Sequence, residues 1–276
     1  MTSAAPPILY VYGVVPLSFD VARAPEGLED AALRLVSDRH AAALVSELDG
    51  DRYSPSEIER ATEDVEWLAP RAVAHDRVLT WASDRGPIVP LPMFSLFSAD
   101  AAVIEMLRTR AVELAAALQS AAQGREYALR VYRIDTELSA VAIEVSPTLA
   151  ELQRAADAAS PGQRYLLQRK LEAAQKSELR AIGQRIARET IDALAPHAVA
   201  AREDAAPRRD PGSGGAELPL VLDAAFLVAP DHFESFQREL TALVAQHRGR
   251  GFRFDFTGPW PPYHFVQEVG EDARRG

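Results

Sequence analysis

Apolar runs separated by polar breaks fill the first part of the chain, and their pattern predicts a small sheet. Residues 8–15 are a β-branched and aromatic run that stops at Pro16, which is typical of a buried strand. Two further apolar stretches, 31–36 and 41–48, flank the polar residues 37–39, which predict a hairpin turn. We therefore expect an amino-terminal sheet that contains these three strands.

Helical patterns follow this sheet. Ser54, Pro55 and Glu57 combine a capping side chain, a proline at the first helical position and an acidic residue in the first turn, and the helix is expected to end near Pro70. Three more segments are predicted: an apolar helix at 72–81, an extended proline-containing piece at 88–92 that cannot lie in mid-sheet, and an alanine-rich helix at 98–118.

The composition changes at Gly124, and the elements predicted after it follow a regular order. They are a strand at 127–134, a long helix at 162–194, a strand at 197–205, a flexible polar loop at 207–215, a strand at 218–228, a helix at 231–247 and a strand at 252–256. This β-α-β-β-α-β order is the split arrangement of ferredoxin-like folds. The sequence thus predicts an α+β fold with two domains, 1–123 and 124–276, of which the second is ferredoxin-like.

Periodicity supports the last two of these elements most strongly. Apolar residues recur every three or four positions from Phe233 to Val244, and Asp231 with Glu234 is expected to cap that helix. Phenylalanines alternate with charged residues over 252–256, as in a strand with one buried face. The prolines at 259, 261 and 262 are expected to end this strand, since proline has no backbone donor.

Composition and charge narrow the function. With 276 residues, 47% of them hydrophobic and 25% charged, the chain has the composition of a soluble globular protein. The absence of cysteine excludes thiol nucleophiles and cysteine-ligated metals, and fits a reducing cytoplasm. A net charge of -10 argues against nucleic-acid binding. Because no secretion signal and no bilayer-spanning apolar segment is visible, a cytoplasmic protein without membrane contact is expected.

No catalytic, cofactor or metal site is predicted. The run 210–215 resembles a phosphate-binding loop superficially but lacks the required Lys and Ser/Thr, and no serine lies in a strand-to-helix nucleophile turn. No two of the six histidines stand four apart on one helix, as a zinc protease needs. One alternative stays open, a hydrolase or transferase with a dispersed site around His75, His232 or His264, although His75 is expected to be a structural hydrogen-bonding residue beside Asp76.

Two places are candidate partner interfaces. On the long helix, Arg169, Arg180 and Arg188 lie opposite the apolar residues expected in the core, where they either face solvent or receive an acidic partner. In the terminal run, residues 258–263, Trp260 and Tyr263 either pack on the core or stand exposed for a partner. A third function, nucleic-acid binding, would use the basic and aromatic residues of the strand at 127–134, namely Arg130, Tyr132 and Arg133, but the net charge opposes it.

Four separated segments resemble the gas vesicle F/L family, in the family's order. They are 10–14, 72–79, 162–170, and 222–228 with the following Phe233 helix and the string Gly258-Pro-Trp-Pro-Pro-Tyr263. The terminal string is the most specific of them. The chain departs from the family at 92–95, where Pro-Met-Phe-Ser stands in place of a proline, an arginine and Phe-Gly.

This resemblance implies a non-enzymatic minor protein of the gas vesicle, a gas-filled shell in the cytoplasm. It implies two α+β domains, the second a modified ferredoxin-like one, without a cofactor. The implied partners are the small hydrophobic main shell protein, whose nucleation and assembly the chain would assist, and other gas vesicle accessory proteins. Since unpaired apolar strands aggregate, we expect the chain to cover them by strand addition or with a hydrophobic groove.

Overall fold

The structure is a computed structural model, and it describes residues 6–204 and 218–266. The chain divides into two compact units, residues 1–126 together with 259–276, and residues 127–258. The boundary predicted after residue 123 lies close to the first division. The end of the chain differs from the prediction, because residues from Pro259 onward group with the first unit and not with the second.

The first unit contains an antiparallel sheet with the order β2-β3-β1-β4, and β5 also pairs with β1. Its strands are β1 (Ile8–Val15), β2 (Leu33–Ser37), β3 (Ala42–Leu48), β4 (Val89–Pro90) and β5 (Leu96–Phe97). The predicted amino-terminal sheet and the β2–β3 hairpin are confirmed. Pro90 lies in the edge strand β4, where its missing N–H removes no ladder hydrogen bond from the middle of the sheet.

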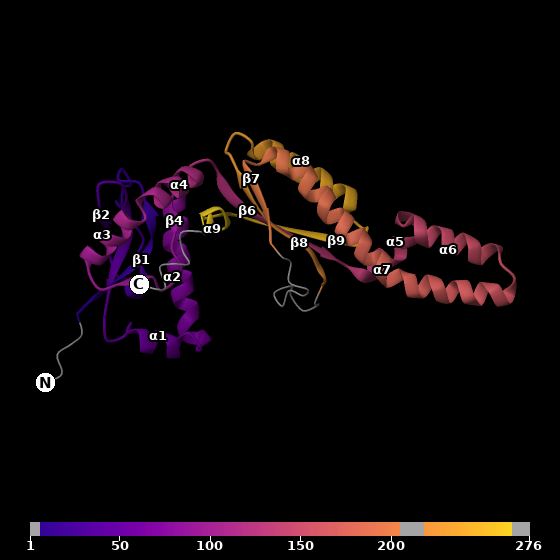
Figure 1. The fold of residues 1–276 in the computed structure, drawn as a ribbon, viewed down its shortest axis with the longest axis horizontal. Helices are drawn as coiled ribbons and strands as arrows, with labels where there is room; N and C mark the ends of the chain where they lie inside the picture. Colours follow the sequence, from indigo (N-terminus) through magenta and orange to yellow (C-terminus); the bar gives the residue numbers. More distant parts are fainter. Residues whose placement is uncertain (1–5, 205–217, 267–276) are drawn as a thin grey trace. The chain divides into compact units, whose positions relative to one another are not determined.

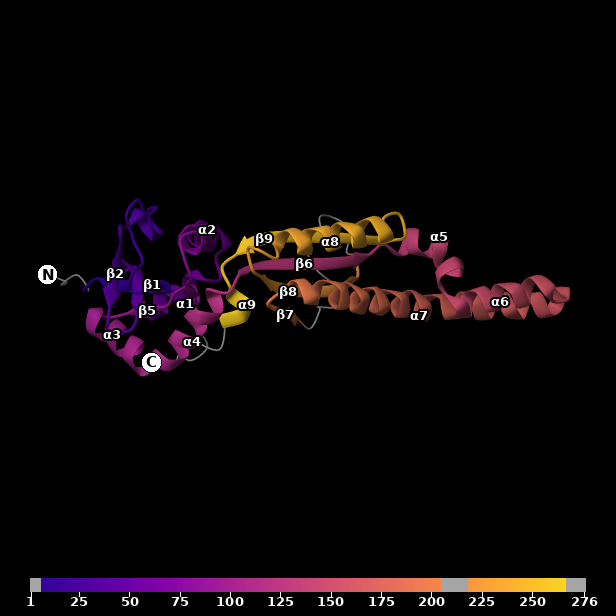
Figure 2. The ribbon, with the colours of Figure 1, turned by 90° about the horizontal axis from the view of Figure 1, so that it is seen from above.

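Of the four helices between β3 and β6, α2 covers one face of this sheet and α3 with α4 covers the other (Figure 2). Their bounds are α1 (Pro55–Ala61), α2 (Val65–Ser83), α3 (Asp100–Thr109) and α4 (Ala111–Ala121), and a short 3-10 turn, η1 (Leu28–Asp30), precedes β2. The prediction that a helix ends at Pro70 is wrong. The first helix ends at Ala61, and Asp64 starts α2 by accepting from the backbone N–H of Glu66 and Trp67, so that Pro70 lies inside α2.

The first unit has a hydrophobic core on each face of its sheet, and strand β1 contributes side chains to both. Leu9 and Val11 face the core under α3 and α4, whereas Tyr10 and Tyr12 face the core under α2. The pairing register with β3 shifts at Gly13, a bulge that exchanges the two faces for the rest of the strand. A Cβ on Gly13 would lie 2.7 Å from the backbone oxygen of Val89, so the close pairing with β4 requires glycine here.

The second unit has the predicted β-α-β-β-α-β order with two additional helices between its first strand and its long helix. Its strands form a sheet with the order β7-β8-β6-β9, which places the first and third strands in the middle. They are β6 (Arg125–Arg133), β7 (Ala200–Glu203), β8 (Leu220–Val228) and β9 (Phe252–Trp260), and β6 and β9 each extend into the first unit. The predicted end of the last strand at Phe256 is wrong. β9 continues through Pro259 because it is the edge strand, where proline is tolerated.

Helices α7 (Pro161–Leu194) and α8 (Phe233–His247) lie side by side over one face of this sheet (Figure 1). Leu129 and Val131 from β6, Phe226 from β8 and Phe236 from α8 form much of the core between them. The α8 cap differs from the prediction, since His232 and not Asp231 is the cap residue and its side chain makes no capping bond. The predicted flexible loop 207–215 lies outside the described residues.

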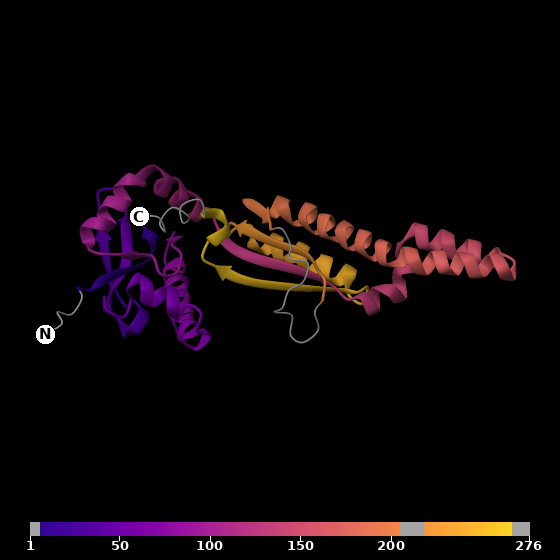
Figure 3. The same cartoon turned by 60° about the horizontal axis from the view of Figure 1, so that its bottom comes forward.

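Two helices that the sequence pattern did not predict, α5 (Asp135–Val145) and α6 (Pro147–Ala158), stand between β6 and α7. α6 and the first half of α7 form an antiparallel hairpin that projects beyond the end of the sheet (Figure 3). The remaining short elements are η2 (Ala195–His197) and α9 (Tyr263–Val266). No helix in the described part of the chain has the length and apolarity needed to span a bilayer.

Candidate functional site

The terminal run packs into the first unit. Pro261 and Pro262 are buried, Tyr263 packs against the core under α2, and Val266 belongs to the core under α3 and α4. Burial, together with the nearby Asp76 carboxylate, raises the pKa of the Tyr263 hydroxyl. Trp260, in contrast, is 37% exposed. Of the two alternatives for this run, Tyr263 therefore packs on the core, whereas Trp260 presents a substantial part of its side chain to solvent.

A buried carboxylate holds this run in place. Glu126 is 1% exposed, and its two oxygens contact His264, one at 2.9 Å from the backbone N–H and the other at 2.5 Å from ring Nδ1. Such a two-point contact fixes both the start of α9 and the orientation of the ring. His264 is thus occupied in anchoring the end of the chain to the first unit.

His75 is also occupied within the fold. Its ring is 7% exposed, its Nδ1 lies 2.7 Å from the Tyr10 hydroxyl, and it stacks on Tyr12. Burial lowers the pKa of His75 to about 4, so the ring is neutral at neutral pH. His232 is the exposed residue that precedes α8. Within residues 6–204 and 218–266, no group of three or more His, Asp or Glu side chains is arranged to hold a metal ion.

The proposed nucleic-acid residues of β6 are engaged by neighbouring side chains. The Arg130 guanidinium lies 3.2 Å from the Asp223 carboxylate, and that of Arg133 lies 2.5 Å from Asp135. The Arg253 guanidinium lies 4.5 Å from the centre of the Tyr132 ring. The two ion pairs neutralise the charges of Arg130 and Arg133, which phosphate binding would need.

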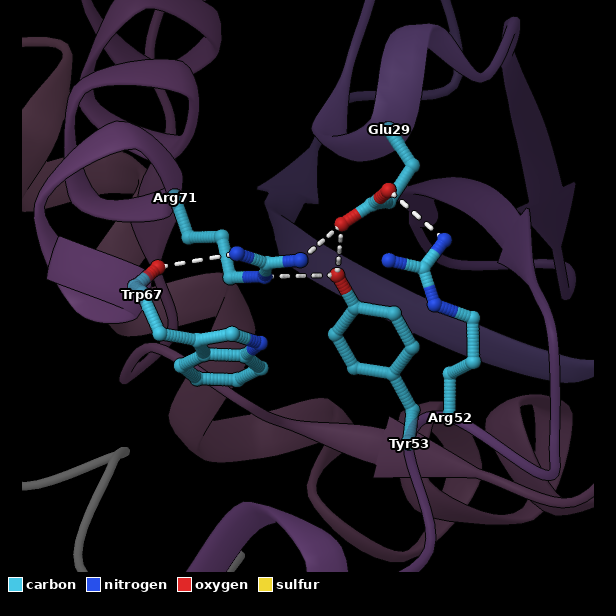
Figure 4. Close-up of polar contacts among 5 residues, drawn as sticks. All are labelled: Glu29, Arg52, Tyr53, Trp67 and Arg71. Atoms are coloured by element: carbon cyan, nitrogen blue, oxygen red, sulfur yellow. Dashed lines mark hydrogen bonds and ion pairs between the residues drawn. The ribbon is translucent and has the colours of Figure 1, made fainter. Parts of the chain in front are cut away.

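A polar network that sequence reasoning missed joins η1 to α2 (Figure 4). The Glu29 carboxylate accepts hydrogen bonds from Arg71, from Arg52 at 3.0 Å and from the Tyr53 hydroxyl at 2.7 Å. The Arg71 guanidinium also donates to the Trp67 carbonyl at 2.8 Å and lies 4.0 Å from the centre of the Trp67 ring. One arginine thus ties a turn, a loop and a helix together.

Charge and burial oppose each other at this network. Burial disfavours the charged form of Glu29, but the hydrogen bond from Tyr53 and the charges of Arg71 and Arg52 outweigh it and lower the pKa of the carboxyl. Burial and the same Glu29 contact raise the pKa of Tyr53 to about 12. Because its groups satisfy one another, the network is a structural element rather than an open site.

Trp67 connects this network to the turn at residues 92–95, where the sequence departs from the family pattern described above. Its ring stacks on Phe94 at 5.5 Å, and Phe94 has a φ of 65°, in the left-handed region. The i,i+4 spacing of Trp67 and Arg71 is the one sequence signal for part of this cluster. The contribution of Glu29 depends on a left-handed turn, with a φ of 53°, that no local motif marks.

The arginines predicted on the long helix separate into two sets. Arg169 and Arg180 are exposed and share one face of α7 with Lys176, a set of side chains that we call the basic row. Arg188 is exposed too, but the helical period turns it well away from that face. Lys176 and Arg180 form no ion pair with any carboxylate of the described residues, whereas Arg169 lies 3.3 Å from the exposed Glu172.

An open groove of about 860 Å³ lies on the hairpin beside the start of the basic row, and we call it the hairpin groove. Alanines from the end of α6, together with Leu166, Leu167 and Ala173 of α7, form its apolar lining, and Arg169 and Lys170 add positive charge. The sequence reasoning missed this groove because it missed α6. The Ser146-Pro147 start of α6, where the Ser146 hydroxyl accepts from Leu149 N–H at 3.2 Å, is the signal that could have found it.

Comparisons with known proteins agree over nearly the whole chain. The family described as gas vesicle synthesis protein GvpL/GvpF matches residues 8–267. The chain is 25% identical to gas vesicle protein L of Streptomyces sp. strain CB03234, over 96% of this chain and 94% of that protein. It is 27% identical to gas vesicle protein L2 of Halobacterium salinarum, over 89% of this chain and 85% of that protein. The crystal structure of GvpF from Anabaena sp. PCC7120 has the same fold, with a TM-score of 0.65 at 19% identity over 95% of this chain and 96% of that one.

Proposed function

Since the chain belongs to the gas vesicle synthesis protein GvpL/GvpF family, we propose that it assists gas vesicle assembly by binding the small hydrophobic main shell protein. The family match over residues 8–267 carries this proposal. The chain would shield apolar surfaces of the shell protein before they join the growing shell, since exposed apolar strands aggregate. It would act beside other gas vesicle proteins and by binding rather than by catalysis.

The roles of the histidines support a binding function. His75 and His264 were the candidates for a dispersed catalytic site in the first unit, and each is held by groups of the fold. A neutral, buried His75 with a pKa of about 4 is a poor general base near neutral pH, because its proton affinity is too low.

Three sheet edges favour a groove over strand addition as the binding mode, whereas the fourth, β2, has five residues and no proline. In the second unit the edge strands are β7, which has four residues, and β9, which carries Pro259. In the first unit one edge is β4, with two residues including Pro90. Short or proline-containing edges pair poorly with an added strand. Trp260 and the arginines of α7 remain the proposed contact residues.

Deletion and complementation test this function. In a cell that forms gas vesicles, loss of the gene should abolish or sharply reduce vesicles, and the intact chain supplied in trans should restore them. Affinity capture of the chain co-expressed with the shell protein should retain that protein at roughly micromolar concentration. Restored vesicles without retention of folded shell protein would contradict direct binding, and unchanged vesicles in the deletion strain would contradict the assembly role.

A further inference from the structure

The first turns of α7 expose apolar side chains beside a groove. Tyr165 is 64% exposed and Leu166 is 62% exposed, and Leu166 also lines the hairpin groove. Ala155, Ala158 and Ala159 form the opposite wall. Because alanine fills little space, this wall leaves room for larger side chains of another molecule. Exposed large apolar residues beside an apolar groove are characteristic of interaction sites.

The hairpin that carries the groove is held by polar contacts at both ends. Near its tip, Arg164 Nε donates to the Ala156 carbonyl at the end of α6, at 3.2 Å. Near its base, the Ser146 hydroxyl donates to the Glu178 carboxylate at 2.7 Å, and Arg185 donates to the Val145 carbonyl at 3.2 Å. A partner would therefore meet a preformed surface and would not have to order it.

Charge identifies the class of partner. Arg169, Lys176 and Arg180 form a positive row on a chain whose net charge is -10, and Lys170 adds a charge at the groove. From residue 169 to residue 180 the row extends roughly 16 Å, about three helical turns. Carboxylates on a partner helix of similar length can follow it, whereas a lone acidic side chain would meet only one of its charges.

We propose that the hairpin groove and the basic row bind an amphipathic helix with an acidic flank from another gas vesicle protein. Its apolar side chains enter the groove between α6 and α7, and its carboxylates lie along Arg169, Lys176 and Arg180. Helix-in-groove binding of this kind uses apolar anchors at three- and four-residue spacing. This inference rests on the proposed function, because it assigns one surface of the second unit to a partner in vesicle assembly.

Site-specific photo-crosslinking in vesicle-forming cells tests the site in the intact chain. The variant Leu166→p-benzoylphenylalanine places the reactive group in the groove, and Val112→p-benzoylphenylalanine, at a residue that is 85% exposed in the first unit, is the matched control. We expect position 166 to cross-link to a gas vesicle protein, within a helix whose carboxylates outnumber its basic residues. We expect no such product from position 112.

Charge reversal then tests the basic row. Arg169→Glu with Arg180→Glu should lower the cross-link yield at position 166 by about fivefold or more, because attraction becomes repulsion. The pair Arg108→Glu with Arg238→Glu, also exposed and helical, should leave the yield unchanged. Thermal melting of each variant verifies that the fold is kept.

The outcomes separate this inference from the proposed function. Cross-linking to a second copy of the chain, to a basic helix or to nothing would overturn the inference, as would a yield insensitive to charge reversal. If the unmodified chain still restores vesicles in those cases, the assembly role stands and only the assigned surface is wrong. If it does not restore them, the proposed function falls and this inference falls with it.

Discussion

Acidification between pH 6.5 and 4 should destabilise the first unit through His75. The Tyr10 hydroxyl oxygen accepts a hydrogen bond from the backbone N–H of Phe94, at 3.3 Å. The same hydroxyl donates its proton to Nδ1 of His75, at 2.7 Å. The other ring nitrogen is left to donate to the backbone of Leu91, a contact that favours the protonated ring. A proton added to Nδ1 would turn an acceptor into a donor facing the Tyr10 proton. Burial penalises that charge further.

The magnitude follows from the displaced pKa. Burial lowers the pKa of His75 from 6.5 to about 4. In this window the unfolded chain binds the proton and the folded chain does not, so the free energy of unfolding falls as the pH falls. At about 1.4 kcal/mol per pKa unit, the full loss is about 3 kcal/mol by pH 4. Above pH 6.5 neither state binds the proton, and this contribution to stability is complete.

Urea unfolding at several pH values measures the effect. All three tryptophans lie in the first unit, so their fluorescence reports on the unfolding of that unit. The variant His75→Gln should be less stable than the natural chain at pH 7 but should lose less stability on acidification. The exposed His232→Gln is the control and should match the natural chain. Parallel curves of unfolding free energy against pH for the natural chain and His75→Gln would refute the reasoning, as would an NMR titration of the His75 ring with a pKa near 6.5.

Three further substitutions probe the contacts that hold the first unit together. Arg71→Lys should lower the free energy of unfolding by about 1–3 kcal/mol, because lysine cannot both reach Glu29 and stack on Trp67. Urea unfolding, with Arg77→Lys as the matched control, would measure this loss. Glu126→Gln should lower the free energy of unfolding by about 1–2 kcal/mol, because it removes the charge from the contact with His264. It should also increase proteolysis near the end of the chain before global unfolding. Equal cleavage rates in the variant and the natural chain would contradict the anchoring role of Glu126. Gly13→Ala should lower the melting temperature more than Gly162→Ala, since its Cβ would lie 2.7 Å from the Val89 oxygen whereas position 162 is open; the reverse order would contradict the bulge argument.

The elements that the sequence predicted well are those whose own pattern determines them. β1 is predicted at its observed ends, Ile8 and Val15, because it is apolar on both faces and stops at a proline. The long helix α7 is displaced by a single residue at its start. The β-α-β-β-α-β order after Gly124 follows from similarly continuous patterns and is confirmed in the sheet of the second unit.

The failures occurred where tertiary context outweighs local signals. Pro70 normally ends a helix, yet α2 continues through it, since Asp64 caps its start and His75, Val78 and Leu79 bury its inner face. Helix α6 has only Leu149 and Ala156 as buried residues, so its apolar pattern is weak until α7 is beside it. The Glu29 network combines residues from three separate segments, and only its Trp67–Arg71 pair has a regular sequence spacing.

The terminal run illustrates why a specific motif need not be a contact site. Its buried prolines, the packed Tyr263 and the Glu126–His264 contact all complete the first unit with residues from the end of the chain. Such a closing segment is constrained in residue type by the cores that it fills, and that constraint alone makes a string of this kind distinctive. Pro259 and Trp260 are the side chains of the run left exposed. A binding role for the run therefore depends on these two neighbours. The hairpin groove, whose lining residues belong to no hydrophobic core, is the stronger candidate for the surface that meets a partner.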